Sequence, residues 1–406
     1  MREGTMQKTW IRRRHRVMRN IAAVLLYPFA RWLYGAKADR FREQGSRAYL
    51  ILMNHQTPFD QFFVGLSFSG PVYYLATEDI FSKGWISDVI RWGAAPIPIR
   101  KQTVDLSALR NCVKVAKEGG TIAIAPEGNR TYSGKTEYMS PAIATLARML
   151  NLPVALYRIE GGYGVQPRWS DNIRRGRIHA YVSEVLEPDE YARLSDDELF
   201  RRIREGLMVN EGVSDGLYES RKRAEYLERA MYVCPWCGLS EFESGGSRAV
   251  CKKCGRGIEY GRDKKLTGVG CAFPFRYITE WYDYQNAFVS GLDMSRHTET
   301  PLYRDRSALY EVIACKQKKL LRKDAALSLY GDRIVIDEGG QSALSLPFSE
   351  IKGMAVLGKN KLNIYHGETT YQLKAGKRFN ALKYMNFYFR YKDIGKGEQN
   401  GKFLGL

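Results

Sequence analysis

Apolar and polar residues follow two patterns in the first half of the chain. Short continuous apolar runs are typical of buried strands, and they predict strands at 48–53, 72–75, 121–125, 152–157 and 178–182. The amphipathic stretches between and after these runs predict helices at 58–68, 85–92, 105–118, 140–150 and 194–209. Strands that alternate with helices favour an α/β sheet. We therefore expect one α/β domain over residues 46–228.

The pattern changes after residue 308, where short strands follow one another without helices between them. Six strands are predicted, at 326–330, 333–336, 344–347, 353–356, 361–365 and 370–373. A helix at 381–390 follows them. Strands closed by one helix resemble a pleckstrin-homology-like (PH-like) barrel, which implies a small, mainly-β domain over residues 308–395.

Two further segments complete the predicted organisation of the second half. Residues 263–307 are aromatic and are predicted to be a linker that contains a helix at 275–288. The tail, residues 396–406, is rich in Gly and Lys and is predicted to be disordered.

His55 and Asp60 flank the first strand-to-helix turn. Pro58 cannot continue a strand but suits the start of a helix. That start places Thr57 at the N-cap and Asp60 at the third helical position, as in a capping box. His55 then stands at the carboxyl end of a strand, the edge where open α/β sheets bind ligands. An imidazole held by a carboxylate can act as a general base. An ordinary loop histidine beside a helix cap is the alternative that this stretch leaves open.

A second strand ends in a similar way, because 121–125 is followed by Pro126-Glu127-Gly128-Asn129-Arg130. Asn-His-x4-Asp followed about seventy residues later by Pro-Glu-Gly-x-Arg, both at strand ends, resembles the glycerolipid acyltransferase family. Its best-known members are the 1-acyl-glycerol-3-phosphate (lysophosphatidate) acyltransferases. The resemblance covers roughly residues 20–210. Asn129 departs from the Thr or Ser usual in the family, which leaves the identity of the acceptor open.

The resemblance implies an activity and roles for individual residues. An acyl chain would pass from a thioester donor, acyl-CoA or acyl carrier protein, to the free hydroxyl of a lysophospholipid. With 1-acyl-glycerol-3-phosphate as the acceptor, the product would be phosphatidate. His55 would be the general base and Asp60 would orient it. Arg130 and Arg100 would bind the acceptor phosphate, with Lys101 as the alternative to Arg100. The other substrate-binding residues would be Asn54, Glu127 and Gly128.

Four of the seven cysteines form two Cys-x-x-Cys-Gly units, Cys234 with Cys237 and Cys251 with Cys254. The glycine lets the chain turn so that backbone amides face the sulfurs. Paired units and an odd total favour a metal site in a reducing compartment over a disulfide framework. Four thiolates predict a structural zinc in a ribbon over residues 229–262, with iron in a rubredoxin-like site as the alternative.

The first fifty residues are strongly basic, with twelve Lys or Arg against three Asp or Glu, so they carry +9 of a net charge of +19. The apolar run at 21–30 is ten residues long, far short of the roughly twenty needed to span a bilayer. Basic flanks with Trp32 and Tyr34 beside it favour a helix in the membrane interface. We expect region 1–45 to dock the protein peripherally on the cytoplasmic face of an anionic bilayer. A signal peptide and a plain core helix with solvated arginines are the alternatives.

Two other function classes fit parts of the sequence. A membrane-docked lipid-binding or regulatory protein without turnover would keep the fold but not both His55 and Asp60. A nucleic-acid binder would concentrate basic and aromatic residues around the cysteine ribbon, whereas the charge maximum lies at the N-terminus. We therefore expect an O-acyltransferase whose partners are a membrane lipid and an anionic bilayer surface, and no nucleic acid.

Overall fold

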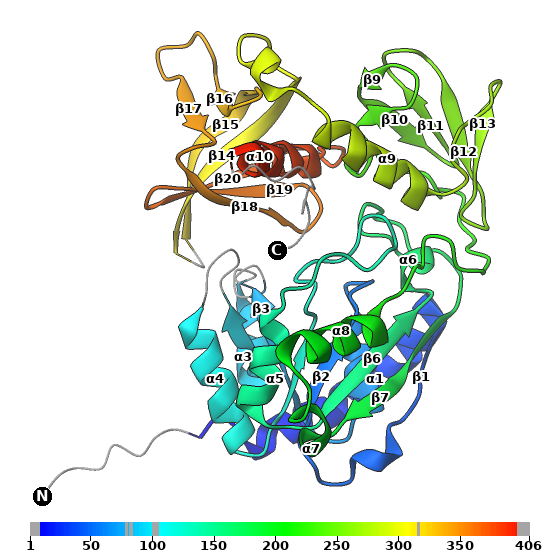
Figure 1. The fold of residues 1–406 in the computed structure, drawn as a ribbon, viewed down its shortest axis with the longest axis vertical. Coiled ribbons are helices and arrows are strands. Elements are labelled where there is room, and N and C mark those ends of the chain that lie inside the picture. Colours follow the sequence, from blue (N-terminus) through cyan, green and yellow to red (C-terminus); the bar gives the residue numbers. More distant parts are fainter. Residues whose placement is uncertain (1–8, 78–79, 81–83, 100–104, 315–316, 396–406) are drawn as a thin grey trace, which may run out of the picture.

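The computed structural model describes residues 9–77, 80, 84–99, 105–314 and 317–395. An α/β unit forms the lower half of Figure 1, and two smaller β-rich units form the upper half. The predicted disordered tail, 396–406, lies outside the described residues. Among the described residues, no helix has both the length and the apolar composition that a membrane span requires.

A seven-stranded mixed sheet forms the centre of the α/β unit. Its neighbouring strands are parallel except for β6 and β7, which are antiparallel. β2 and β5 lie next to each other in the middle, and every residue of both strands is buried. The strand order is β1 (Ala36–Ala38), β7 (Ile178–Leu186), β6 (Val154–Glu160), β2 (Leu50–Met53), β5 (Thr121–Ile124), β3 (Val72–Thr77) and β4 (Ile97–Ile99).

Helices cover both faces of this sheet because successive side chains of each strand point to opposite sides. Leu50 and Leu52 of β2 belong to the core beneath α4 (Leu106–Lys117), α5 (Ala142–Leu150) and α8 (Asp196–Leu207). Ile51 and Met53 belong to the core beneath α1 (Arg13–Tyr34) and α2 (Asp60–Ser67). α3 (Trp85–Gly93) contacts α1. The short helices are η1 (Arg42–Gln44), α6 (Gly162–Val165) and α7 (Pro188–Tyr191).

The cysteine-rich region contains a two-stranded and a four-stranded antiparallel sheet. β8 (Val233–Cys234) pairs with β9 (Gly238–Leu239), after the short helix η3 (Leu227–Arg229). The larger sheet has the order β10 (Phe242–Gly245), β11 (Arg248–Cys251), β12 (Gly257–Tyr260) and β13 (Leu266–Val269).

Residues 263–307, predicted as a linker, differ from that expectation. They contain β13, the helix α9 (Ile278–Ser290), the short helix η4 (Met294–His297) and the start of β14 (Tyr303–Ala314). Trp281 and Tyr282 of α9 are buried in a core that the cysteine-rich region and the C-terminal sheet share. The aromatic residues of this segment are therefore core residues that join two sheets.

The C-terminal sheet has seven antiparallel strands and is closed by the helix α10 (Ala381–Gly395). All six predicted strands are present, and β14 precedes them. The assignment to the PH-like class stays a prediction. The strand order is β17 (Leu344–Pro347), β16 (Arg333–Ile336), β15 (Gln317–Leu329), β14 (Tyr303–Ala314), β20 (Thr369–Lys374), β19 (Lys361–His366) and β18 (Ile351–Leu357).

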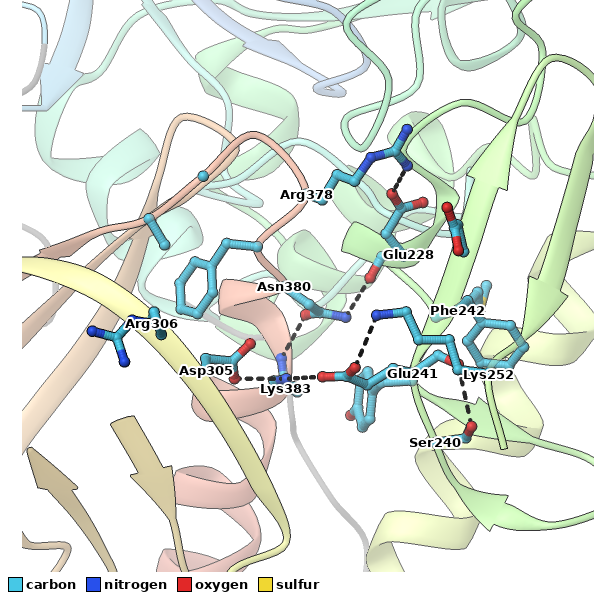
Figure 2. Close-up of a pocket in the computed structure, with 16 residues that line it drawn as sticks. Glu228, Ser240, Glu241, Phe242, Lys252, Asp305, Arg306, Arg378, Asn380 and Lys383 are labelled. Carbon is cyan, nitrogen blue, oxygen red and sulfur yellow. Dashed lines mark hydrogen bonds and ion pairs between the residues drawn. The ribbon is translucent and has the colours of Figure 1, made fainter. Parts of the chain in front are cut away.

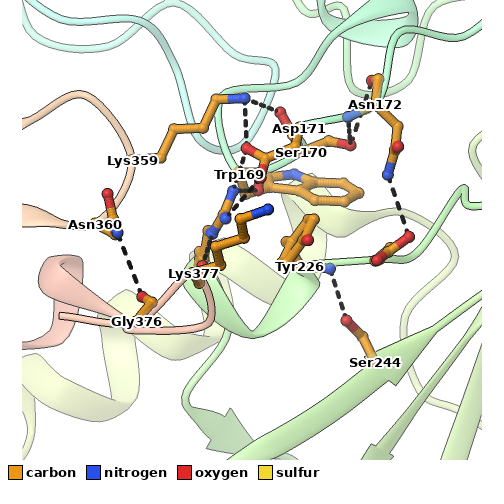
Figure 3. A network of polar contacts seen from close by, with 12 residues as sticks. Trp169, Ser170, Asp171, Asn172, Tyr226, Ser244, Lys359, Asn360, Gly376 and Lys377 are labelled. Carbon is orange, nitrogen blue, oxygen red and sulfur yellow. Dashed lines mark hydrogen bonds and ion pairs between the residues drawn. The ribbon is translucent and has the colours of Figure 1, made fainter. Parts of the chain in front are cut away.

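A polar network joins the C-terminal sheet to the loop after α6 (Figure 3). Lys359, in the turn between β18 and β19, donates from Nζ to the carbonyl of Ser170 at 2.6 Å and to Asp171 Oδ1 at 2.8 Å. Arg229 donates to both oxygens of the same carboxylate, at 2.8 and 3.1 Å. The Arg229 Nε–H also donates to the carbonyl of Lys377. Asp171 is thus the shared acceptor of two cations.

The two cations give Asp171 a pH-dependent contribution to stability. Burial would raise the pKa of Asp171, but the ion pairs with Arg229 and Lys359 outweigh it and lower that pKa to about 2. An unfolded Asp titrates near 3.9. A group whose pKa falls on folding stabilises the fold above its unfolded pKa, and the stabilisation is lost as pH falls towards its folded pKa.

We therefore expect Asp171→Asn to lower the free energy of unfolding at pH 7 by about 1 kcal/mol, because the ion pair is partly exposed. The difference from wild type should shrink between pH 4 and pH 2.5, as followed by urea unfolding and circular dichroism. Asp324→Asn, which breaks an exposed ion pair with Arg306, is the control. A loss of stability that is equal at every pH would contradict the assignment.

Candidate active site

The loops that follow β2 and β5 meet because the two strands are neighbours in register. Leu52 pairs with Ile124, so the chain leaves both strands at the same edge of the sheet. The backbone N–H of His55 donates to Glu127 Oε1 at 2.9 Å, and the N–H of Thr131 donates to the His55 carbonyl at 3.3 Å. The structure thus brings together two motifs that are about seventy residues apart in the sequence.

His55 and Asp60 form a hydrogen-bonded pair. His55 Nδ1 lies 2.8 Å from Asp60 Oδ2. Asp60 is fully buried, whereas 17% of the His55 side chain is exposed. A carboxylate beside Nδ1 favours the tautomer in which Nδ1 carries the proton and Nε2 carries a lone pair. This arrangement leaves Nε2 able to take a proton.

The turn between β2 and α2 is built around the Asp60 carboxylate. It accepts the backbone N–H of Gln56 at 2.6 Å and that of Thr57 at 2.9 Å. The predicted capping box is only half formed, because the Thr57 hydroxyl donates to the carboxylate and accepts the N–H of Phe59. The N-cap is therefore Phe59, and α2 begins at Asp60 rather than at the predicted Pro58.

Burial lowers the pKa of His55 below its ordinary value. The hydrogen bond and the negative charge of Asp60 raise this pKa but do not offset burial, and the positive charges of Arg130 and Arg168 lower it further. The imidazole is therefore neutral at neutral pH, which is the form that accepts a proton.

Asn54 and Glu127, both predicted to bind substrate, are fully buried and hold the backbone of the site. The Asn54 amide donates to the Ile159 carbonyl at 2.8 Å and accepts the Ile159 N–H at 2.7 Å, which ties the end of β2 to β6. Glu127 accepts the N–H of His55 through one oxygen and the N–H of Glu137 through the other. Burial raises the pKa of Glu127 to about 8.

Arg130 has one donor without a partner. Its Nη1 is buried and makes no hydrogen bond within the part of the chain that the structure describes. Burial, together with the charge of Arg168, lowers the pKa of Arg130 to about 10. An unpaired buried donor is costly, so this pattern is expected where a ligand supplies the acceptor. Gly128 is exposed at the turn before it, with a φ of +66° that favours glycine. Arg100 and Lys101 lie outside the described residues.

Arg168 is a site residue that the sequence did not reveal. It donates from Nη1 to the carbonyl of Arg130 at 2.9 Å and from Nη2 to Asn129 Oδ1 at 3.3 Å. Nη2 also donates to the Val356 carbonyl of β18 at 3.3 Å, and the guanidinium lies 4.4 Å from the ring centroid of Tyr132. Arg168 therefore connects the loop of Arg130 to the C-terminal sheet. No motif or spacing marks this position, because the contact arises only in the tertiary structure.

Comparison with known proteins finds a family match in this region. Residues 36–159 match the family model described as Acyltransferase. The chain contains an acyltransferase-family domain. The matched residues run from β1 nearly to the end of β6, and they include His55, Asp60 and Arg130.

Two relatives match parts of the chain. The 1-acyl-sn-glycerol-3-phosphate acyltransferase of Bacillus subtilis (strain 168) is 22% identical over 136 residues, which are 34% of this chain and 65% of the relative. A chloroplastic 1-acyl-sn-glycerol-3-phosphate acyltransferase of Brassica napus is 23% identical over 166 residues, which are 39% of this chain and 46% of the relative. The chain thus spans less than two thirds of either relative's length.

A crystal structure of the 1-acyl-sn-glycerophosphate acyltransferase of Thermotoga maritima also matches. The TM-score is 0.40 at 22% identity, and the match covers 48% of this chain and 80% of that structure.

Beyond the acyltransferase domain, the four predicted zinc ligands come together. The sulfurs of Cys234, Cys237, Cys251 and Cys254 all lie within 4.8 Å of one another. Two of the separations are 3.7 and 3.6 Å. Four sulfurs bound tetrahedrally to one zinc at about 2.3 Å lie about 3.8 Å apart.

The backbone around these sulfurs has the predicted turn geometry. The N–H groups of Trp236 and Cys237 bond to the sulfur of Cys234, and those of Lys253 and Cys254 bond to the sulfur of Cys251. The donor set and its geometry therefore fit a tetrahedral zinc.

A pocket of about 350 Å³ also lies outside the acyltransferase domain, between the cysteine-rich region, β14 and α10 (Figure 2). Its charged residues are largely paired with one another. Lys383 lies 2.8 Å from Asp305, Lys252 lies 3.2 Å from Glu241, and Arg378 bonds to Glu228. Of these pairs, Arg378 with Glu228 joins the two β-rich units. His55 and Arg130 are not among the lining residues.

Proposed function

We propose that this protein transfers an acyl chain from a thioester to the free hydroxyl of a lysophospholipid, with 1-acyl-glycerol-3-phosphate as the acceptor and phosphatidate as the product. The observation that carries the proposal is the His55–Asp60 pair at 2.8 Å on the loop that also contacts the Arg130 segment. The names of the two curated relatives support the choice of acceptor. Acyl-CoA and acyl carrier protein both present the same thioester, so either can serve as the donor.

The proposed reaction needs one base and no covalent acyl-enzyme. Nε2 of His55 removes the proton of the acceptor hydroxyl as its oxygen attacks the thioester carbonyl. An ester bond forms, the carbon–sulfur bond breaks, and the thiolate leaves with the electron pair. The imidazolium then returns the proton to the thiolate. Asp60 holds the ring through Nδ1 and stabilises its positive charge during the step.

In this proposal Arg130 binds the acceptor phosphate. Its buried, unpaired Nη1 supplies a donor that a phosphate oxygen can accept, and a guanidinium matches phosphate geometry. Glu127 acts indirectly, because it holds the backbone of His55. Gly128 allows the positive φ of the turn before Arg130.

We further propose that α1 docks the protein on an anionic bilayer as a peripheral protein. Val24, Leu25 and Trp32 on its outer face are 73%, 68% and 83% exposed, and Arg13 and Arg16 are also exposed. The opposite face packs on the domain through His15, Ala30 and Tyr34, which are buried. An outward apolar stripe with basic flanks is the pattern of an interfacial helix.

The cysteine cluster is proposed to hold one structural zinc. All four positions of a tetrahedral site would be filled by thiolates, so the metal would stabilise the cysteine-rich region and take no part in the acyl transfer.

His55→Ala should lower kcat by on the order of 10²–10⁴ while changing stability little. Wild-type activity should fall as the pH is lowered, with a midpoint below pH 6.5. The pKa of His55 is lowered, and its protonated form cannot act as a base. Turnover of labelled oleoyl-CoA with a panel of lysophospholipids measures both effects. His179→Ala, which removes an exposed histidine 2.6 Å from Asp39, is the matched control. Near-normal turnover of His55→Ala would sink the assignment.

The triple variant Val24→Ser, Leu25→Ser, Trp32→Ser should no longer sediment with liposomes that contain phosphatidylglycerol, because it removes the apolar contact while keeping the fold. Wild-type binding should weaken at high salt, since surface attraction to anionic lipid is screened. Met208→Ser, Leu217→Ser changes exposed apolar residues away from α1 and should sediment as wild type does. Unchanged sedimentation of the triple variant argues that another surface docks.

The purified protein should contain about one zinc per chain, because four thiolates complete one tetrahedral site. Mass spectrometry of the metal content should show the zinc lost in the Cys234→Ser, Cys251→Ser variant and kept in the Cys271→Ser control. One iron in place of zinc would assign the rubredoxin-like alternative, and a wild type without either metal would refute the site.

A further inference from the structure

The outer face of α1 continues into a group of aromatic rings at the start of α2. The phenylalanine cluster consists of Phe29, Phe59 and Phe62. The ring centroid of Phe59 lies 5.9 Å from that of Phe29 and 5.3 Å from that of Phe62. Phe29 stands one helical turn after the exposed Leu25, so the cluster and the α1 stripe adjoin.

The cluster is not part of the closed core. Phe29 and Phe62 are 38% and 39% exposed, whereas Phe63, which follows Phe62 on α2, is fully buried. An adjoining core that buries Phe63 and Phe68 completely shows that this region can enclose aromatic rings. The cluster therefore presents open apolar surface.

The cluster lies beside the proposed base. Phe59 immediately precedes Asp60, whose carboxylate holds His55. Tyr34 packs on Phe59 with ring centroids 4.8 Å apart. The N–H of Phe59 donates to the Thr57 hydroxyl at 3.1 Å, and that hydroxyl donates to the Asp60 carboxylate at 2.7 Å. The cluster therefore adjoins the turn that holds His55. Arg130, whose Nη1 has no partner among the described residues, directly precedes Thr131, whose N–H donates to the His55 carbonyl.

We propose that the phenylalanine cluster binds the acyl chain of the lysophospholipid acceptor. This inference rests on the proposed acyl transfer and adds a binding site to it. A lysophospholipid carries an acyl chain, a free hydroxyl and a phosphate on one glycerol. The protein offers three matching groups in the same region, namely the cluster, His55 and Arg130.

The same rings would also suit the acyl chain of the thioester donor. The position of the cluster favours the acyl chain of the acceptor. The cluster adjoins the α1 stripe, which the docking proposal sets against the bilayer. The acceptor resides in that bilayer, whereas the donor arrives from water on a soluble carrier. A chain that slides from the bilayer along α1 reaches the cluster before it reaches His55.

The test compares chain-length dependence for acceptor and donor. The variant Phe29→Ser, Phe62→Ser removes the two exposed rings, and Phe29→Leu, Phe62→Leu retains apolar side chains. Acceptors are lysophosphatidates with acyl chains of increasing length in detergent micelles, so that docking does not contribute. Leu217→Ser, which changes an exposed apolar residue outside α1 and the cluster, is the control. Donors form a second series of acyl-CoAs.

In wild type, kcat/KM should rise with acceptor chain length. In the serine variant, the ratio of kcat/KM between long-chain and short-chain acceptors should decrease by on the order of tenfold. This corresponds to the free energy of burying about two methylene groups. The leucine variant and Leu217→Ser should keep the wild-type ratio, and the donor series should be unchanged in every variant. A changed donor series with an unchanged acceptor series would overturn the proposal in favour of the donor chain. Unchanged values in both series would mean that the rings only pack.

A photoreactive lysophosphatidate with a diazirine in its acyl chain separates this inference from the proposed function. Cross-links on the peptides that carry Phe29, Phe59 or Phe62 are expected even if no acceptor supports turnover. In that case the acyl transfer fails and the binding site stands. Turnover together with cross-links only elsewhere refutes the binding site and leaves the acyl transfer intact.

Discussion

The pairing of β2 with β5 in the centre of the first sheet is the constraint on which the site depends. Both strands are parallel and buried, so their carboxyl ends open onto the same edge. The loop that follows each strand then forms hydrogen bonds with the loop that follows the other. Glu127 from the second loop fixes the backbone of His55, and the His55 carbonyl accepts the N–H of Thr131. A shift in this register would separate the base from the cation without changing either motif.

The sequence predicts those residues whose interactions are with near neighbours in the chain. His55 and Asp60 are five positions apart across a turn that Pro58 favours, and the pair forms as expected. The strands at 333–336 and 344–347 have their predicted bounds. The predicted start of the helix was wrong, because the Asp60 carboxylate accepts more hydrogen bonds than a capping residue requires. The Thr57 hydroxyl serves the carboxylate, and the helix starts later.

The residues that the sequence did not predict depend on partners from distant segments. β14 was missed where it carries Arg304, Asp305 and Arg306 in succession, a poor strand pattern. Asp305 faces inward there and is paired with Lys383 of α10 at 2.8 Å, and the Tyr384 hydroxyl donates to it at 2.7 Å. Arg168 has the same origin, since its acceptors are in a loop about forty residues before it and in β18. No local pattern contains this information.

The arrangement of apolar and charged groups also bears on how a membrane lipid could reach a base at a sheet edge. Drawing an acyl chain out of a bilayer into water costs about 0.8 kcal/mol for each methylene group. An apolar surface that continues from the bilayer to the base removes most of this cost, because the chain exchanges one apolar environment for another. Only the glycerol and the phosphate must then leave the interface. In the proposed function, the unpaired Nη1 of Arg130 would donate to that phosphate. In the proposed function, the demand on the enzyme is therefore a continuous apolar path, and the α1 stripe, the phenylalanine cluster, His55 and Arg130 would supply it in that order.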